Sequence, residues 1–387
     1  MKKILIVILL ISFTVLSFSQ IDPLSPWNRK LNPALISWSA RNIIELSGGI
    51  NSGIIQESLD TLEKAVDLNL LGNEGNYYNL DDSNILSRNV NADMYAKLKL
   101  GVFVLAPELS ISNIDWHKFS TLDYRNALWV NGGLHIGLKG KDFSFGGTIK
   151  SSLPVYDVVR KNDGADYTLI TAFPDEMYDL PYTYSLLYDG PGELFNHMDT
   201  LMDKLMNNGI ITLDVGFVAG KDYPAIGFGV KDIPIADGVG IYKYDAYAHV
   251  EYSKETLEFS SFNLVEASNE RVWSKFKPWK MTFFITLPII LDFVPSIEYA
   301  PNTEDFTWGV AAGKRLLWGA LPFWAEIKNH SINTDYDTIS YWTFNGGLGV
   351  NIYLAEIHMS LSTQAPTTDE LFNARNTAIN LNMSVGF

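Results

Sequence analysis

The chain contains no cysteine, and this absence excludes several kinds of chemistry at once. Without thiols the chain can form no disulfide, no thiolate metal site and no cysteine nucleophile. A lipid anchor on an N-terminal cysteine is excluded for the same reason. A chain without thiols suits an envelope protein, because such a protein then has no thiol chemistry to manage.

Positive charge is also scarce. The sequence has 29 Lys and Arg residues against 44 Asp and Glu residues, which gives a formal net charge of −15. Nucleic acid is therefore not expected as a partner, because binding its phosphates requires a basic surface. The acidic excess fits a protein whose loops face water.

Long apolar runs are few, and the clearest one is N-terminal. Residues 4–18 are uncharged and mostly apolar, they follow Lys3, and Ser17 and Ser19 supply small residues at the cleavage-site spacing. This pattern predicts that residues 1–19 are a secretory signal peptide, cleaved on export. The run is too short to cross a hydrocarbon core of ~30 Å comfortably as a helix.

No later segment of the sequence qualifies as a membrane helix. The longest apolar stretch, residues 283–294, is interrupted by Thr286, Pro288 and Asp292. The chain is nevertheless 47% hydrophobic and 13% aromatic. Since lipid tolerates only helices and closed barrels, an exported chain of this composition indicates strands that cross the membrane.

The last strand carries the clearest signal of this kind. Every second residue is apolar back from Phe387, and the intervening residues are small or polar. The pattern resembles the C-terminal assembly signal of bacterial outer-membrane β-barrels. That resemblance implies the barrel-assembly machinery as a partner, with an assembly signal formed by Phe387, Val385, Met383 and Leu381.

The same alternation of period two recurs along the chain. It predicts an all-β fold, a transmembrane antiparallel up-and-down β-barrel over residues 43–387. Residues 242–252 add tyrosines at both ends of an apolar lane, which is typical of an aromatic girdle at the lipid boundary. The alternative is a soluble exported pair of β-sandwiches or a propeller, in which the polar lanes would face solvent instead.

The expected number of strands follows from the lengths of the connections between them. Short turns alternate with long connectors, so both chain ends are expected on the periplasmic side and the count is expected to be even. We predict about 16 strands, including one at Glu108–Trp116 that follows a tight turn at Ala106-Pro107. The alternative count is 14, with one early segment inside the lumen.

Residues 20–42 form an irregular lead-in rich in Pro and Asn. It is expected either to lie in the lower lumen as a hatch or to lie on the periplasmic side. The sequence Asn32-Pro33-Ala34 within it is similar to the start of FadL/TodX-type barrels and of the related barrels of surface-secretion systems. The resemblance implies a transport barrel in outline.

Two amphipathic helices are predicted in long outer loops, at Ser52–Leu71 and Pro191–Asn208. The second follows an acidic and aromatic stretch. One interpretation is a helical lid over the lumen with an aromatic binding surface. The other is that the two helices pack against each other and the barrel rim. The candidate lid residues are Tyr178, Tyr182, Tyr184, Leu194, Met198 and Leu201.

The polar lanes of the predicted strands carry charges of both signs. Because a buried charge without a partner is costly, these groups require water or one another, which favours a hydrated lumen. The candidate lumenal residues are Lys97, Lys99, Asp214, Lys243, Asp245, His249, Glu251, Glu298, Glu326 and Glu356.

Enzymatic chemistry is not expected. A barrel phospholipase would need a lipid-facing serine beside a histidine, and the strand histidines fall on polar lanes instead. The histidines have no metal-ligand spacing, and the sequence has no P-loop, dinucleotide fingerprint or nucleophile elbow. No cofactor and no metal are expected.

The sequence thus predicts a barrel in the bacterial outer membrane, with membrane lipid as a partner. Its expected function is passive passage of small molecules, hydrophobic ones included, through a polar lumen. The alternative is a structural or interaction barrel with a plugged lumen that binds an envelope protein, anchoring a surface layer or serving a secretion assembly.

Deletion of Phe387 is expected to impair membrane assembly more than any lumenal substitution does, because the terminal aromatic belongs to the assembly signal. The measurement is the fraction of heat-modifiable protein in the outer membrane. Normal assembly of the truncated chain would contradict this prediction.

Overall fold

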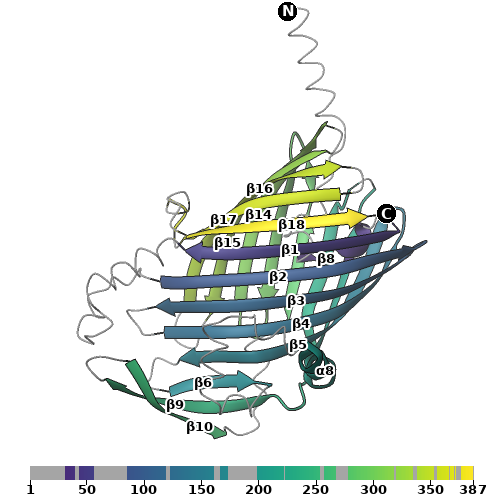
Figure 1. The fold of residues 1–387 in the computed structure, drawn as a ribbon. Coiled ribbons are helices and arrows are strands. Elements are labelled where there is room, and N and C mark those ends of the chain that lie inside the picture. Colours follow the sequence, from purple (N-terminus) through teal and green to yellow (C-terminus); the bar gives the residue numbers. More distant parts are fainter. Residues whose placement is uncertain are drawn as a thin grey trace, which may run out of the picture.

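The structure is a computed structural model. It describes residues 31–39, 43–55, 85–118, 123–160, 166–172, 198–221, 223–252, 257–266, 278–317, 320–333, 338–352, 355–365, 367–369, 371 and 376–386. Strands dominate these ranges, and they wrap around a central axis (Figure 1).

The elements follow one another as α3 (Ala34–Trp38), β1 (Ile44–Ile55), β2 (Ile85–Leu100), β3 (Phe103–Lys118), β4 (Asp123–Lys139), β5 (Phe143–Arg160), β6 (Asp166–Thr171), α8 (Met198–Asn208), β7 (Ile210–Ala219), β8 (Ile226–Ala236), β9 (Tyr242–Tyr252), β10 (Leu257–Glu266), β11 (Lys280–Ile285), β12 (Leu287–Pro288), β13 (Asp292–Ala300), β14 (Asp305–Leu316), β15 (Leu321–Asn333), β16 (Thr338–Ile352), β17 (Ala355–Ala365) and β18 (Asn376–Gly386).

The strands close into a ring of antiparallel neighbours. Pairing runs in order from β1 to β5, passes from β5 to β7 and β8, continues to β11 and β13, and then follows the chain to β18. Strand β18 pairs with β1, which completes the circle. Of the 18 strands in the described residues, β6, β9 and β10 stand outside this ring, and the two-residue β12 continues β11 along β13, so the ring contains 14.

The all-β closed barrel is therefore confirmed, with the alternative count of 14 rather than 16. The difference lies at β9 and β10, which branch from the wall (Figure 1). Strand β6 pairs with the outer part of β5, β9 pairs with β6, and β10 pairs with β9. Alternation of period two identifies a strand but does not show which neighbour the strand pairs with. The count predicted from the sequence therefore included β9 and β10 as strands of the wall.

The turn expected at Ala106-Pro107 is wrong. Strand β3 runs straight through both residues, and the turn lies at Gly101-Val102 instead. Gly101 has a φ of +63°, a conformation that glycine adopts without strain. The strand predicted from Glu108 is thus the second half of a longer strand.

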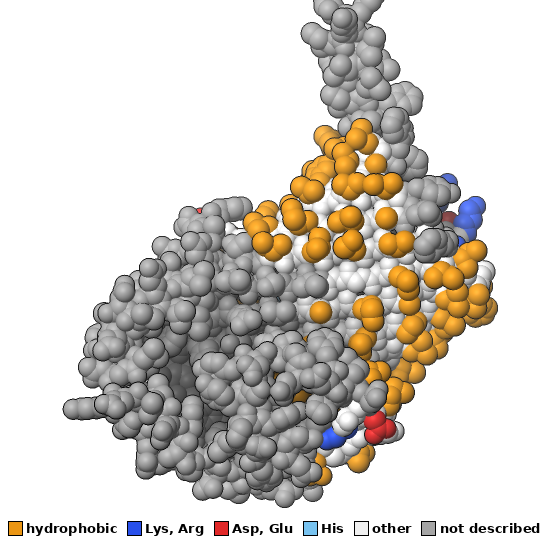
Figure 2. Space-filling model, viewed as in Figure 1, with side chains coloured by type: hydrophobic (Ala, Val, Ile, Leu, Met, Phe, Trp, Pro, Cys, Tyr) orange, Lys and Arg blue, Asp and Glu red, His pale blue; other side chains and the backbone are white. Residues whose placement is uncertain are grey.

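Side chains alternate between two environments around the ring. On β18, Leu381, Met383 and Val385 are 42%, 50% and 40% exposed, while Asn382 and Ser384 are buried. Apolar side chains lie in rows across the outer wall (Figure 2). In a soluble sandwich the apolar lane would be buried. Here it faces outward, which requires an apolar solvent.

One end of the barrel has short turns, and we call it the short-turn end. It includes the turns at 101–102, 140–142, 289–291 and 317–320. The wall is uneven at the opposite end, because β4 and β5 have 17 and 18 residues whereas β7 and β11 have 10 and 6. The branch of β6, β9 and β10 lies on the side where the wall is low.

Helix α8 covers the second half of the helix predicted at Pro191–Asn208, and residues 191–197 lie outside the described residues. The helix predicted from Ser52 begins within β1, which continues to Ile55, and residues 56–71 also lie outside the described residues. In the described ranges, no helix has the length and apolarity needed to span a membrane.

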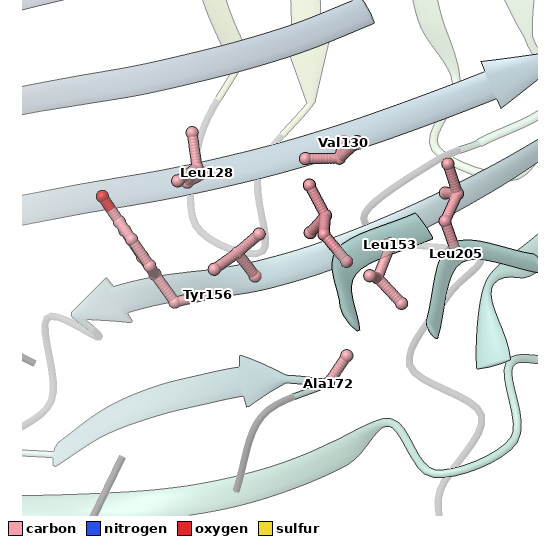
Figure 3. Close-up of a cluster of buried hydrophobic side chains, with 8 residues drawn as sticks. Leu128, Val130, Leu153, Tyr156, Ala172 and Leu205 are labelled. Carbon is pink, nitrogen blue, oxygen red and sulfur yellow. The ribbon is translucent and has the colours of Figure 1, made fainter. Parts of the chain in front are cut away.

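Helix α8 packs on the outer wall, which corrects the expected position of Leu201 over the lumen. Leu201 and Leu205 are buried against Leu128 and Leu153 of β4 and β5 (Figure 3). These wall residues belong to the outward lane that also holds the exposed Ile149. The apolar face of α8 therefore meets the apolar side of the wall, because the lumenal side is polar.

The remaining candidate lid residues are not placed over the lumen either. Tyr178, Tyr182, Tyr184 and Leu194 lie outside the described residues. Met198 is the first residue of α8, and the position of its side chain is not described.

The substitution Leu381→Lys is expected to destabilise the folded barrel by ~2–4 kcal/mol, because it places a charge on the lipid-facing lane near mid-wall. The measurement is urea-dependent folding into lipid vesicles, followed by heat modifiability on gels. Leu381→Met is the matched control and is expected to fold like the parent chain. Equal stability of the Lys variant would contradict the lane assignment.

Candidate functional site: a plugged lumen and the cavity above it

Residues 31–39 lie inside the ring at the short-turn end, and we call them the plug segment. Leu31, Ala34 and Leu35 are buried in one cluster with wall side chains that include Phe284 and Trp324. The plug segment contacts mainly β4, β5 and β7. It thus fills the lumen at the end where the barrel turns are short.

Glycines in the inward lanes make room for this segment. A Cβ atom at Gly216 would collide with Asn32 and Pro33, and one at Gly137 would collide with Ser37. A larger side chain at either position would displace the plug segment from the wall. These glycines therefore allow close approach of the plug rather than flexibility of the strand.

The first half of the plug segment is bonded to β5 and β7. The Asn32 side chain donates from Nδ2 to the Phe217 carbonyl at 3.3 Å, and its Oδ1 accepts from the Ala34 amide at 2.9 Å. The Ser144 hydroxyl donates to the Ala34 carbonyl at 3.0 Å. Asn32 is fully buried, so both ends of its amide are satisfied where water is excluded.

The second half is bonded to β2 and β4. The Ser37 hydroxyl lies 2.8 Å from His135 Nε2. Lys139 Nζ donates to the Trp38 carbonyl at 2.6 Å, and Lys97 Nζ donates to the Ser39 hydroxyl at 3.0 Å. Each of these bonds involves a side chain, in contrast to the continuous backbone ladders of the wall.

Lys97 also forms a buried ion pair in the lumen. Its ammonium group lies 3.1 Å from Glu45 Oε1, and both side chains are buried. The Tyr95 hydroxyl donates to the same carboxylate at 3.3 Å. A buried pair of this kind tolerates the loss of one partner poorly, because the other charge would remain desolvated. The pair therefore holds β1 and β2 together beside the plug segment.

Above the plug segment, Lys150 lies between two carboxylates. Its ammonium group is 2.8 Å from Asp214 Oδ1 and 2.6 Å from Asp232 Oδ1. The three residues come from β5, β7 and β8, and their side chains are largely shielded from solvent. The cluster carries a formal charge of −1.

A β-bulge brings Asp232 into this cluster. The register between β7 and β8 shifts at this point, since Leu213 pairs with Ile233 but Val215 pairs with Val230. Asp232 has a φ of +56°, and its amide donates to Asp214 Oδ1 at 2.7 Å. Strict alternation after Lys231 would have aimed the Asp232 carboxylate outward at lipid. The bulge turns it into the lumen instead.

A second ionic cluster of opposite sign lies next to the first. The carboxylate of Glu298 pairs with two ammonium groups, that of Lys231 at 2.6 Å and that of Lys280 at 3.1 Å. These residues come from β13, β8 and β11, so the two clusters together tie five neighbouring strands of the ring, from β5 to β13. The second cluster carries a formal charge of +1, which balances the first.

The other candidate lumenal residues have different positions. Glu326 pairs with Lys328 at 2.7 Å, and Glu356 lies 3.6 Å from His358 Nε2. Lys99 is half-buried near the short-turn end of β2.

Four candidates need correction, because β9 lies outside the closed ring and does not form part of the wall around the lumen. Their side chains lie outside the described set. They are Lys243, Asp245, His249 and Glu251.

Two histidines of the described lumen, His135 and His330, are held by hydroxyl groups. His135 Nδ1 lies 3.0 Å from Thr148 Oγ1, opposite its contact with Ser37. His330 lies 3.1 Å from Thr307 Oγ1 and 3.0 Å from Thr343 Oγ1, and its ring stacks on Tyr341. Both rings therefore cross-link the wall. Among the described residues, no group of His, Asp or Glu side chains has the arrangement of a metal site.

A cavity of about 450 Å³ lies directly above the plug segment. Pro33 and Ile36 form its floor, and its sides come from β2, β3, β5, β7 and β8. The lining includes Lys150, Asp214 and Asp232. The volume is in the range of small-molecule sites.

Sequence reasoning did not select the pair Lys231-Asp232 as lumenal. Two consecutive charges in a strand break the alternation, and this break was the available signal for a bulge. Asp93 and Glu108, which also line the cavity, were not selected either. The turn wrongly predicted at Ala106-Pro107 placed Glu108 at the end of a strand rather than within the wall, so it was not selected.

A closed ring with an apolar exterior and charged interior fits lipid outside and water inside. The chain is a β-barrel of the outer-membrane type. This exterior is the surface on which such a barrel meets the membrane.

No family model and no curated protein sequence matches the chain. Solved structures similar to it include a TodX monoaromatic hydrocarbon channel mutant, with 8% identity, coverage of 92% of this chain and 93% of that chain, and a TM-score of 0.47. The Ralstonia pickettii toluene transporter TbuX has 9% identity, coverage of 95% and 94%, and a TM-score of 0.41. The translocator domain of the autotransporter NalP from Neisseria meningitidis has 7% identity, coverage of 93% and 95%, and a TM-score of 0.36.

The substitution Lys150→Met is expected to lower the free energy of unfolding by ~3 kcal/mol, because Asp214 and Asp232 would lose the ammonium group that they share. The measurement is denaturant-dependent unfolding in detergent. The double variant Lys150→Met/Asp214→Asn removes one charge of each sign and is expected to lose less than the single variant. A larger loss in the double variant would contradict the shared-ammonium arrangement.

Proposed function

We propose that this barrel is a passive channel for small molecules and that the plug segment is its gate. The observation that carries the proposal is the contrast between plug and wall. The wall is a closed set of backbone ladders, whereas side-chain bonds and one apolar cluster hold the plug segment. Each neutral bond of this kind stabilises by ~0.5–1.5 kcal/mol and each bond from a lysine by ~1.5–3 kcal/mol, so the few bonds of the plug segment break before the many that close the wall.

The lumen above the plug segment supports passage of solutes. Its charged clusters at Lys150 and Glu298 require a polar environment, and the cavity beside them has room for a small molecule. A solute that enters from the long-loop end would reach Pro33 and Ile36 and stop there. Displacement of the plug segment would then complete the path.

The alternative is an interaction barrel whose lumen stays closed. The tight fit of the plug segment favours this alternative. Asn32 and Ala34 are fully buried, and the space between Gly216 and Asn32 would not hold even a Cβ atom. In that case the outer face and the loops would bind an envelope protein. The two functions differ in whether the plug segment ever leaves the lumen.

A disulfide lock separates these functions, since the native chain has no cysteine that would interfere. The paired substitutions Ala34→Cys and Ser144→Cys place two thiols where the plug segment touches β5. In planar bilayers, the reduced variant is expected to show openings, and oxidation is expected to abolish them. Each single substitution serves as the control.

A variant that lacks residues 31–39 completes the experiment, with heat modifiability as the check that it folds. It is expected to conduct continuously. A folded barrel without the plug segment that stays silent would overturn the channel and favour the interaction barrel. Equal conductance of oxidised and reduced locked protein would overturn the role of the plug segment as the gate.

A further inference from the structure

The wall divides at β5, because this strand changes neighbours along one of its edges. Up to Ser152 it pairs with β7, and from Asp157 onward it pairs with β6. Neither of these two ladders includes residues 153–156. At membrane depth, backbone outside a ladder or helix is tolerated only where protein covers it. The division therefore needs a cover on the side that faces lipid.

Helix α8 provides this cover from outside the ring (Figure 3). Leu201 and Leu205 are buried against a cluster that includes Leu153 of β5. The hydroxyl of Ser151, in the same outward lane as Leu153, donates to the Leu205 carbonyl. A Cβ atom at Gly132 of β4 would come within 3.0 Å of the Leu205 side chain. The helix thus lies directly on the outward side of the divided wall.

The two flanks of α8 have different surroundings. On one flank, Lys204 donates to the Ala172 carbonyl at the end of β6, at a distance of 2.9 Å. Met206 follows two residues later, a rotation of ~200° about the helix axis, so it lies on the opposite flank together with Met202. The side chains of Met202 and Met206 are 37% and 72% exposed. This methionine flank, defined by these two residues, is an apolar surface that the wall leaves uncovered.

The height of α8 on the wall brings the methionine flank to the outer leaflet. Short turns are periplasmic in barrels of this type, so height is measured from Phe143 at the short-turn end. Ser151, beneath α8, lies eight residues further along β5. At ~3.3 Å per residue and a tilt of ~40°, this is ~20 Å up a lipid-facing band ~25 Å tall. Ile149, just below, is 54% exposed in the lipid-facing lane. The methionine flank therefore continues a surface that already meets lipid.

We propose that α8 is an interfacial helix in the outer leaflet, where its methionine flank contacts lipid chains and the helix seals the divided wall. Asp203 and Asn207 are exposed on the side away from the wall, and this polar face meets the headgroups. Methionine suits a lipid contact, because its flexible thioether adapts to mobile chains. The assignment does not depend on whether the plug segment opens.

Fluorescence quenching tests this contact, and a chain without native cysteine allows labelling at a single site. The full chain is folded into phosphatidylcholine vesicles with a nitroxide on the acyl chains. A bimane label on Met206→Cys is expected to lose most of its fluorescence to the nitroxide and little to aqueous iodide, because the flank lies in lipid. Asn207→Cys, the next residue, is the matched control and is expected to be quenched mainly by iodide. Heat modifiability confirms that each variant is folded.

A second substitution tests how α8 is held on the wall. In the labelled Met206→Cys chain, Gly132→Leu places a side chain beneath Leu205 and is expected to lift the helix, so that iodide quenches the label more strongly. Gly48→Leu is the matched control in the outward lane of β1. A Cβ atom there would make only an ordinary contact, 3.5 Å from the nearest backbone oxygen, so quenching is expected to stay unchanged.

Each outcome decides one part of the assignment. Iodide quenching at Met206 as strong as that at Asn207 would overturn the lipid contact. Protection of the Met206 label from both quenchers would also overturn it, since protein rather than lipid would then cover the flank. Unchanged quenching in folded Gly132→Leu protein would overturn the position of α8 on the wall. The conductance of the barrel enters none of these results, so the helix is tested separately from the plug segment.

Discussion

Closure of β18 on β1 is the constraint on which the rest of the structure depends. The two strands pair without interruption from Glu45 and Gly386 to Ile55 and Asn376. In lipid an unpaired strand edge would expose amide and carbonyl groups that nothing could satisfy, so a wall of this kind exists only as a closed ring. Once the ring is closed, the period of two divides every strand between lipid and lumen, and each side chain becomes either a membrane contact or a lumenal group.

This division explains how a chain with so many charges can form a membrane wall. Charged lumenal groups of the described strands form short-range sets. The Lys150 set and the Glu298 set have opposite signs and lie side by side, and the Lys97–Glu45 pair is neutral and lies beside the plug segment. Each set joins strands that are neighbours in the ring, so it reinforces the ladder that already links them. The same groups make the interior hydrophilic. Helix α8 packs through apolar side chains and therefore lies on the apolar exterior instead.

The alternation along each strand predicted the features that a single strand determines, namely the strand itself and the side to which each side chain points. The outward lane of Leu381 and the barrel class followed from it, and so did a helix ending at Asn208. It could not predict which strands become ring neighbours, because pairing is decided by segments far apart in sequence. This is why β9 and β10 were counted as wall and why Lys243 was placed in the lumen. It also missed Asp232, because a bulge reverses the lane of one residue without changing the composition of the strand.

The plug segment and the cavity act on each other through Pro33 and Ile36, which belong to the first and form the floor of the second. In the channel that we propose, a solute bound in the cavity would therefore touch the gate as well as the wall. Any movement of the plug segment changes the shape of the site, and by reciprocity any solute that prefers one shape biases the plug segment. The wall cannot respond in this way, because opening it would break backbone ladders in lipid. In the proposed channel, the coupling between solute and gate would therefore reside in the side-chain contacts of residues 31–39.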